Sequence, residues 1–583
     1  MTAASDDRTR LAIAGIVLAL TLPFSAKPFH IDDVYFIEVA QNVQRDPLRP
    51  LAGAVALEDE DYRVFTAQGH CPSTFTSMSH PPLVPYVIAL AAWAARGFTE
   101  RVLHLAFVPF ALAAGLAMHS LSRRFTRHPR AATLLLLTSP VFVLSSHSLM
   151  TDMPALAFSS AALALFVRGL DEDRRRWIVF SGLLAGLAVL TRYSTALTPL
   201  LMLAYGATRG RARRTLPALA AAALVTAVWM AQNLLVEGRL HLLASTEHYR
   251  LFYEGQSFDG AGLVKKTLSD MSGLGGTAFA AAGLLLLAGT WRRAVTFAAA
   301  ALAAAAVFVV KPPSIDRLAA YSSTDVSVVA GFFALGAVLV VEALWPAPDG
   351  GPMVDEGAAP DTDRAGRMDH GFLVLWLVSA LATALFLLPF GTARYLLPAL
   401  PPLWLLLVRR ADAILGAGTA LRLTFGLAVA QGAALSVILG LADMELARGY
   451  REVARSVRAS HPDRTIWFVG EWGFRFYMNT VGGRYLRSTD ERPEEGDIIV
   501  RPGIAGMHVI SDGVEERSVR LQQISLPGRW PVRLMSFDAK AGYYSHHWGY
   551  LPWRYAHYPL ETIDIFQVRA PAPAAPAETC ASS

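Results

Sequence analysis

The stretch LAIAGIVLALTLPFSAKPFHIDDVYFIEVAQNV, residues 11–43, decides the fold class of this chain. Its first part belongs to an apolar run at 10–29, which has about the 20 residues that a helix needs to cross a bilayer. Two adjacent carboxylates, Asp32 and Asp33, follow that run. Apolar side chains then recur at helical spacing, which predicts an amphipathic helix on the membrane surface. The stretch therefore indicates a membrane protein with a pair of acids near the lipid–water boundary.

The composition agrees with that class, because 53% of the 583 residues are hydrophobic and only 17% are charged. Ordinary soluble domains carry about 25% charged residues. With the first run, the apolar segments predict a mostly α, polytopic protein with about thirteen transmembrane helices. The further segments lie near 101–122, 131–149, 153–170, 177–192, 195–208, 215–236, 273–290, 294–310, 323–345, 371–389, 394–408 and 412–441.

The distribution of arginine predicts the orientation in the membrane. If the N-terminus is cytoplasmic and the short run 82–96 does not cross, nearly every arginine cluster of the apolar part faces the cytoplasm, as the positive-inside rule requires. These clusters are SRRFTRHPR (122–130), DEDRRR (171–176), TRGRARR (208–214), WRR (291–293) and RRAD (409–412). Residues 82–96 are therefore predicted to be interfacial or re-entrant, with a crossing as the alternative. Residues 1–26 also resemble a signal peptide, but cleavage would leave Asp32 outside as well.

Two domains are predicted. Residues 1–442 form a membrane domain with a first outer loop at about 30–100 and a cytoplasmic linker at 346–370, which is rich in Pro, Gly and Asp. Residues 443–583 form a small soluble α/β domain on the outer face, because RTIWFVG (464–470) and GDIIV (496–500) resemble buried strands with a helix between them. We expect an inner (plasma) membrane location, a cytoplasmic N-terminus and a periplasmic or extracellular C-terminal domain.

Cysteine and charge exclude several functional classes. Two cysteines, Cys71 and Cys580, are too few for a disulfide framework or a Cys-rich metal site, and whether they pair stays open. The net charge of +5 is small and the arginines follow the loops, so nucleic acid is not an expected partner. Phosphate-binding glycine loops and a Ser/His/Asp signature are missing from the sequence.

Six polar residues are predicted on the outer side, where chemistry at a lipid surface would take place. A carboxylate at Asp32 or Asp33 can accept a proton or bind a metal, although a solvated helix flank explains the pair equally well. His80, in SHPPLVPY, can donate to a phosphate oxygen, and Asp152, in TDMP, suits a helix N-cap. Arg192 and Arg394 are predicted on the outer side, although most arginines of the apolar part are predicted on the cytoplasmic side. Each is therefore expected to bind a phosphate or to extend to the lipid headgroups.

These motifs, in this order, resemble the GT-C superfamily of integral-membrane glycosyltransferases that use polyprenyl-phosphate sugars. The sequence is most similar to the group of protein O-mannosyltransferases and lipid A aminoarabinose transferases. The similarity covers roughly residues 10–410 and rests on IDDVYFIEVA, HPPLVPY, TDMP, TRYS and RYLLPALPPL. Two positions depart from the pattern: Asp33 stands where Glu is common, and His80 where several relatives have Lys.

The resemblance implies inverting transfer of a sugar to an acceptor on the extracytoplasmic face. Asp32, with Asp33, would be the catalytic pair, and Asp32 is the expected base. His80, Arg192 and Arg394 would bind the donor phosphate, while Asp152 would orient the acceptor. A divalent ion is left open, with Asp33 and Asp152 as its ligands. The expected partners are the bilayer, a polyprenyl-phosphate-linked sugar donor and a lipid, glycan or protein acceptor.

Three alternatives stay open at this point. A transporter or flippase of lipid-linked sugars would explain many spans and outward arginines, but we find no hydropathically repeated halves. An envelope glycan polymerase or ligase would share much of the chemistry. A catalytically inactive relative serving as a scaffold is disfavoured by the intact acids. The sugar, the acceptor and the oligomeric state are not predicted.

Overall fold

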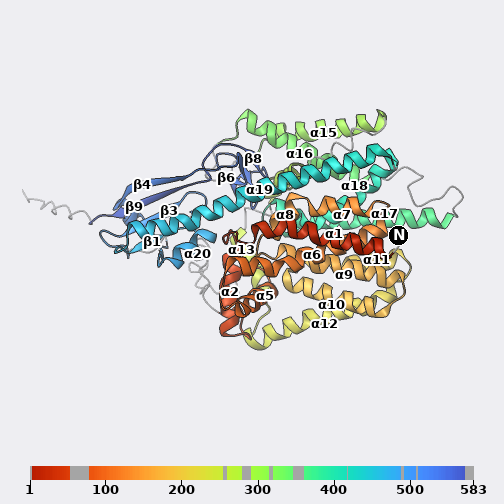
Figure 1. Cartoon of the computed structure of the whole chain (residues 1–583), viewed down its shortest axis with the longest axis horizontal. Coiled ribbons are helices and arrows are strands. Elements are labelled where there is room, and N and C mark those ends of the chain that lie inside the picture. The colour runs from red at the N-terminus through yellow and green to blue at the C-terminus, as the bar shows by residue number, and fades with distance from the viewer. Residues whose placement is uncertain are drawn as a thin grey trace, which may run out of the picture.

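The computed structural model describes residues 3–52, 78–253, 259–278, 290–313, 320–345, 360–416, 418–487, 492–506 and 510–570. A helical bundle forms one end of the molecule and a β-sheet region forms the other (Figure 1). Cys71 and Cys580 lie outside the described residues, as does the 346–359 part of the predicted linker.

The bundle consists of helices that run roughly alongside one another (Figure 1). They are α1 (Ala3–Thr21), α6 (Glu100–Phe125), α7 (Pro129–Leu137), α8 (Pro140–Ser146), α9 (Asp152–Asp171), α10 (Arg175–Thr191), α11 (Leu197–Thr208), α12 (Ala212–Glu237), α14 (Gly260–Ala278), α15 (Thr290–Val310), α16 (Ser323–Leu344), α17 (Pro360–Ala382), α18 (Leu400–Leu415) and α19 (Thr419–Ser460). Three shorter helices lie at the end nearer the sheet: α2 (Asp33–Arg45), α5 (Leu83–Ala94) and α13 (His241–Tyr253).

Six helices in the described part of the chain are long and apolar enough to span a membrane: α6, α9, α12, α16, residues 366–387 and α19. The pair α7 and α8 makes a seventh if it is one span bent by 57°. The expected thirteen spans are not confirmed by the described residues, where several predicted spans are short helices. For example, α10 and α11 have 17 and 12 residues, fewer than the roughly 20 that cross a bilayer directly.

The bend between α7 and α8 has a local cause. Pro140 lacks the backbone N–H that would continue α7, and Ser139 instead accepts a hydrogen bond from Phe142 N as the N-cap of α8. The predicted single span at 131–149 is therefore broken.

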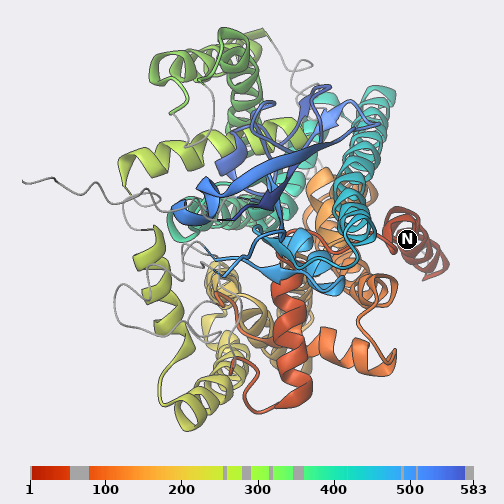
Figure 2. The same ribbon diagram turned by 90° about the vertical axis from the view of Figure 1, so that its left-hand side faces the viewer.

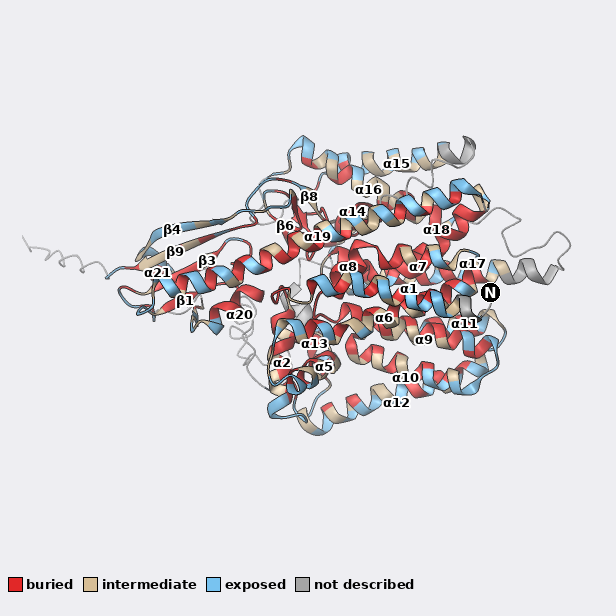
Figure 3. Cartoon of the chain, viewed as in Figure 1, coloured by how far each residue is buried: buried red, intermediate tan, exposed pale blue. Residues whose placement is uncertain are grey.

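The outer faces of the bundle are apolar, as expected for lipid contact. Leu224 and Val228 on α12 are each 64% exposed, and Leu427 on α19 is 70% exposed. Buried residues gather on the inward faces of the helices (Figure 3). A surface with this many exposed aliphatic side chains suits hydrocarbon rather than water. The structure thus supports an integral membrane protein.

Small residues allow two helices of the bundle to pack closely. A Cβ on Gly275 of α14 would lie 1.9 Å from the Phe332 carbonyl oxygen, and one on Gly336 of α16 would lie 2.0 Å from that of Met271. Close approach through small side chains is a common way for membrane helices to pack. This contact fixes α14 beside α16.

The arginine clusters meet at one end of the bundle. Arg124 and Arg209 both pair with the buried Asp369, and Arg123 pairs with Asp6 near the N-terminus. The sheet lies at the opposite end (Figure 1). The loops that the sequence assigned to one side therefore do share a side.

The sheet region, drawn in blue in front of the helices in Figure 2, contains a five-stranded mixed sheet in the order β2-β1-β3-β9-β4. Its strands are β1 (Ile466–Phe468), β2 (Arg484–Tyr485), β3 (Ile498–Pro502), β4 (Ser518–Leu526) and β9 (Glu561–Val568). Strand β1 pairs in parallel with both β2 and β3, and α20 (Trp472–Thr480) followed by β2 separates β1 from β3 in the chain, so the predicted strand–helix–strand unit contains one more strand than expected. Remaining elements are α21 (Asp512–Glu516) and the strand pairs β5 (Val532–Arg533) with β8 (Arg554–Tyr555) and β6 (Met535–Ser536) with β7 (Ala541–Gly542).

Two of the predicted boundaries fall inside helices of the structure. Helix α19 has 42 residues and continues through the expected domain boundary at 442/443 toward the sheet region. Residues 360–370, expected in a flexible linker, instead begin α17. The short run at 82–96 forms α5, whose 12 residues span about 18 Å at 1.5 Å per residue. That length is too short for a direct crossing and agrees with the predicted interfacial or re-entrant position.

Candidate functional site

Two arginines and two aspartates meet where the bundle faces the sheet region. Arg192 Nη1 donates to Asp152 Oδ1 at 2.7 Å. Arg394 lies between two carboxylates, because its Nη1 donates to Asp152 Oδ2 at 3.3 Å and its Nη2 donates to Asp32 Oδ2 at 3.2 Å. Four of the six residues predicted from the sequence are therefore joined in one chain of ion pairs.

The local structure explains why these side chains meet. Asp152 begins α9, Arg192 directly follows α10, and Asp32 directly precedes α2. Arg394 lies in a 3₁₀ turn, Ala393–Ala399, that leads into α18. Each residue is at a helix end, so the ends of four elements converge on one point.

Tyr395 lies beside both guanidinium groups. Its ring centroid is 4.5 Å from Arg192 Cζ and 5.1 Å from Arg394 Cζ. An aromatic face attracts such cations, and the effect grows when water is excluded. The sequence-based reasoning missed Tyr395, although it stands next to Arg394 in the RYLLP motif.

Both arginines keep donors without a partner among the described residues. These are Nε and Nη2 of Arg192 and Nε of Arg394. The two residues are only 6% and 8% exposed, so these N–H groups are removed from water. A guanidinium has five N–H donors, and unsatisfied buried donors are costly. The arrangement is suited to an additional anionic ligand.

Asp32 and Asp33 have different surroundings. Asp33 is fully buried and accepts hydrogen bonds from His30 N at 3.0 Å and Leu149 N at 2.8 Å. It therefore connects the first loop to the turn before α9. The Asp32 side chain remains 30% exposed and contacts Arg394. Burial raises the pKa of Asp32, and the positive charge of Arg394 offsets this effect only in part.

His80 lies near the same cluster. Its ring stacks on Phe36 of α2, with the ring centroids 6.4 Å apart. Burial lowers the pKa of His80 well below its usual value, and the nearby charges of Arg192 and Arg394 lower it further. His80 is thus held neutral beside the two arginines.

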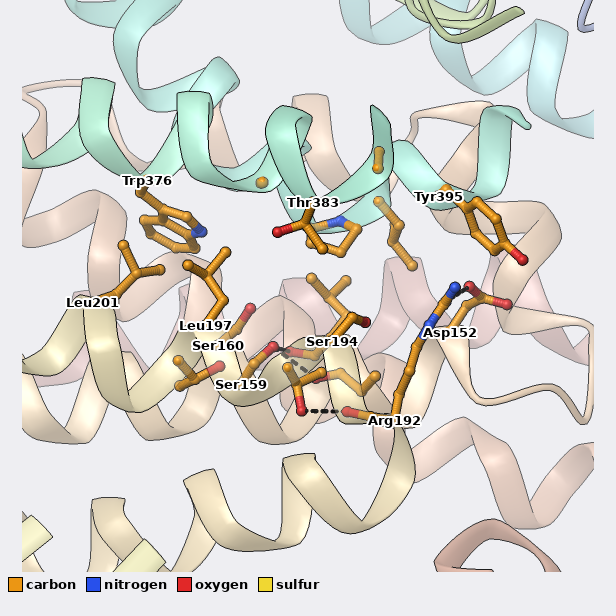
Figure 4. Close-up of a pocket in the computed structure, with 18 of the residues that line it drawn as sticks. Asp152, Ser159, Ser160, Arg192, Ser194, Leu197, Leu201, Trp376, Thr383 and Tyr395 are labelled. Carbon is orange, nitrogen blue, oxygen red and sulfur yellow. Dashed lines mark hydrogen bonds and ion pairs between the residues drawn. The ribbon is translucent and has the colours of Figure 1, made fainter. Parts of the chain in front are cut away.

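An apolar cavity within the bundle ends at this cluster. Its lining includes Leu197, Leu201 and Trp376 at one end and Asp152 and Arg192 at the other, as Figure 4 shows. One wall is a π-helical turn, Thr383–Leu387, at the end of α17. Such turns often accompany functional sites in helices. The cavity therefore joins an apolar lining to the Arg192–Asp152 ion pair.

The carboxylates proposed as metal ligands do not suit a divalent cation. Asp33 accepts backbone N–H groups, and both oxygens of Asp152 face guanidinium groups. In the part of the chain that the structure describes, no group of three His, Cys, Asp or Glu residues could hold a metal ion.

Two buried ion clusters connect the first loop to the rest of the protein, and both were missed from the sequence. Asp443 of α19 accepts hydrogen bonds from Lys27 at 2.5 Å and from the Tyr544 hydroxyl at 2.7 Å. An acid within an apolar helix is costly without a partner, which was the available signal.

The second cluster joins α2 to α20. Arg475 Nη2 donates to Glu38 Oε1 at 2.7 Å, and its Nη1 lies 2.9 Å from Glu471 Oε2. These contacts hold the helix behind Asp32 against the sheet region.

Comparisons with known proteins agree with this picture. A family profile described as dolichyl-phosphate-mannose-protein mannosyltransferase matches residues 79–234, about a quarter of the chain, including His80, Asp152 and Arg192. A search of curated proteins found no match.

Solved structures with a similar arrangement of elements were also found. ArnT from Cupriavidus metallidurans in the apo state has 16% identity and a TM-score of 0.41, over 86% of this chain and 93% of that one. The oligosaccharyltransferase of Archaeoglobus fulgidus, in complex with Zn and sulfate, has 13% identity and a TM-score of 0.43, over 82% of this chain and 62% of that one. The Pmt1-Pmt2 protein O-mannosyltransferase complex of S. cerevisiae has 14% identity and a TM-score of 0.27, over 48% and 37%. Over residues 79–234, the profile match confirms the resemblance to protein O-mannosyltransferases that the motifs predicted.

Proposed function

We propose that this protein transfers a sugar from a polyprenyl-phosphate donor to an acceptor, at the end of the bundle that faces the sheet region. The observation that carries the proposal is the apolar cavity that ends at Arg192 and Asp152. A polyprenyl phosphate has a long hydrocarbon chain and an anionic head, so its two parts match the two ends of the cavity. The family description, which names dolichyl-phosphate mannose, supports the same class of donor.

The two arginines stabilise the leaving group. The donor is a phosphodiester with one negative charge, and cleavage of the anomeric C–O bond leaves its electron pair and a second charge on the phosphate. The unpartnered N–H groups of Arg192 and Arg394 supply donors for those oxygens. Neutral His80 can donate one further hydrogen bond.

Asp32 acts as the base. The acceptor hydroxyl or amine gives its proton to the Asp32 carboxylate while its oxygen or nitrogen attacks the anomeric carbon. The partial exposure of Asp32 supports this role over Asp33, whose oxygens are occupied by backbone donors. Asp152 holds both arginines and so orients the phosphate site. Attack from the face opposite the phosphate inverts the anomeric configuration.

The orientation and domain division belong to the same proposal. The end with the arginine clusters faces the cytoplasm, and residues 443–583 lie on the periplasmic or extracellular side of the inner (plasma) membrane. This assignment is supported by the convergence of the arginine loops on one end of the bundle. Residues 1–442 then carry the membrane part of the site.

The test is turnover of labelled donors by the protein in lipid nanodiscs. A panel of polyprenyl-phosphate sugars is offered with lipid, glycan and peptide acceptors, and sugar transfer is measured. Asp32→Asn should abolish transfer, whereas Asp46→Asn, at the exposed opposite end of α2, should retain it. Full activity of Asp32→Asn would remove Asp32 as the base. Movement of intact donor across a bilayer without transfer would favour a transporter.

A further inference from the structure

The loop that carries Arg394 is held by the C-terminal region. Gly391 N–H donates to Nδ1 of His546 at 2.9 Å, and His546 N–H donates to the Gly391 carbonyl oxygen at 2.9 Å. The Thr392 hydroxyl donates to the Tyr543 carbonyl oxygen at 2.6 Å. Two residues separated by 155 positions in the chain therefore share a reciprocal pair of hydrogen bonds.

The same loop is also held from the side of the bundle. Thr392 N–H donates to Asp270 Oδ1 of α14 at 3.1 Å. A Cβ on Gly391 would lie 2.7 Å from Ser269 Cβ and 3.0 Å from Lys266 Cα, so this backbone passes close to α14. Contacts from both sides leave the loop little freedom to move. Arg394 follows Gly391 by three residues, at the start of its 3₁₀ turn.

The state of the His546 ring decides whether the contact exists. Nδ1 can accept the Gly391 N–H only when it carries no proton. His546 is 2% exposed, and burial together with the neighbouring His547 lowers the pKa of His546 well below its usual value. The ring is therefore neutral, with its proton on Nε2.

Hydrogen bonds of this kind fix direction as well as distance. Apolar packing alone would hold the C-terminal region on the bundle, but it would leave the loop free to rotate. The paired bonds at Gly391 fix the orientation of the peptide groups that lead to Arg394. Arg394 must in turn reach Asp32, Asp152 and a phosphate together.

We propose that His546 is a positioning residue for sugar transfer, which fixes Gly391 and thereby places the guanidinium of Arg394. This inference rests on the proposed function, because the purpose of the placement is to meet the donor phosphate. It extends the site to the C-terminal region, which contributes alignment rather than a reacting group.

The experiment compares three variants in nanodiscs: His546→Phe, His546→Asn and His557→Phe. Phenylalanine keeps the aromatic shape but loses the acceptor, whereas the asparagine amide oxygen can take the place of Nδ1. His557 is exposed in the same region and serves as the matched control. Hydrogen–deuterium exchange at Gly391 reports the contact without any substrate, and transfer kinetics report its effect on the reaction.

In His546→Phe, exchange at Gly391 should rise about tenfold, the effect of losing one hydrogen bond of roughly 1.4 kcal/mol. The value of kcat should fall about 100-fold, as expected when a binding group is displaced by an ångström. KM should change less, because the phosphate charge that Arg394 meets grows in the transition state. His546→Asn should restore both readouts, and His557→Phe should match the wild type.

Two results would overturn the inference. The first is faster exchange at Gly391 in His546→Phe with unchanged kcat, since the contact would then be structural only. The second is a fall in kcat with unchanged exchange, since His546 would then act by another route. If the wild type transfers no sugar from any donor, the proposed function fails, and this inference fails with it even where exchange at Gly391 responds as expected.

Discussion

Arg192→Lys separates the role of the guanidinium fork from that of its charge. A lysine ammonium can still pair with Asp152, to which Arg192 Nη1 donates at 2.7 Å. It cannot replace the Nε and Nη2 donors, which have no partner among the described residues. We therefore expect the ion pair to survive and the phosphate contacts to be lost.

The size of the effect follows from those two donors. Hydrogen bonds to charged groups contribute about 1.5–3 kcal/mol each, and neighbouring bonds are not additive. A loss of about 3 kcal/mol corresponds to a fall in kcat/KM for the donor of roughly 100-fold, at 1.4 kcal/mol per factor of ten. Inhibition by the product, polyprenyl phosphate, should weaken by a similar factor because it uses the same donors.

The assay is transfer of labelled sugar at varied donor concentrations, with and without added polyprenyl phosphate. Arg213→Lys is the control, since Arg213 is exposed at the arginine-rich end of α12. The midpoint of thermal unfolding should be the same in both variants and the wild type. A wild-type kcat/KM for the donor together with wild-type product inhibition in Arg192→Lys would refute the assignment of Arg192 to the phosphate.

Three further predictions follow from the surroundings of the site. Asp33→Asn should lower the free energy of unfolding by about 1–3 kcal/mol, because the asparagine amide cannot accept hydrogen bonds from both His30 N and Leu149 N. Thermal unfolding measures this change. Asp32→Asn is the control and should keep the wild-type midpoint. Leu201→Trp should fill the apolar cavity and raise the donor KM at least tenfold. Leu200→Trp, at a neighbouring residue that is 62% exposed, should leave the donor KM unchanged. Equal effects in the two variants would contradict the placement of the lipid chain in the cavity. Burial raises the pKa of Asp32 above the ordinary aspartate pKa of 3.8, and only the ionised carboxylate accepts a proton. As the pH is lowered, kcat/KM should therefore begin to fall at a pH above 3.8. A pH profile that stays flat through that region would exclude Asp32 as the base.

The sequence predicted the parts of this fold that depend on local pattern. The helix at 33–45 follows from apolar spacing, and the strand–helix–strand unit at 464–500 follows from two apolar runs with a helix between them. The sequence also placed Asp32, Asp152, Arg192 and Arg394 on one side of the membrane, and these four side chains meet in the structure. Orientation bias assigns loops to a side of the membrane, and the polar residues on one side form a short list.

Membrane spans were harder to predict than strands, because hydropathy reports how apolar a segment is and not whether the segment forms one unbroken helix. Pro140 divides one apolar run into α7 and α8. Helix α19 continues without a break through the expected domain boundary at 442/443. The sequence therefore predicted more spans than the described residues form, and placed the domain boundary inside a helix.

What the sequence determined by itself is a membrane protein with acids and arginines at one end of its helices. Only the tertiary structure distinguished Asp32 from Asp33, placed Tyr395 against both arginines and brought His546 to Gly391. Adjacent residues have the same sequence context but point in different directions at a helix start, so their partners depend on which distant segments pack there. Local pattern can predict which residues reach the site, and long-range packing decides what each of them does.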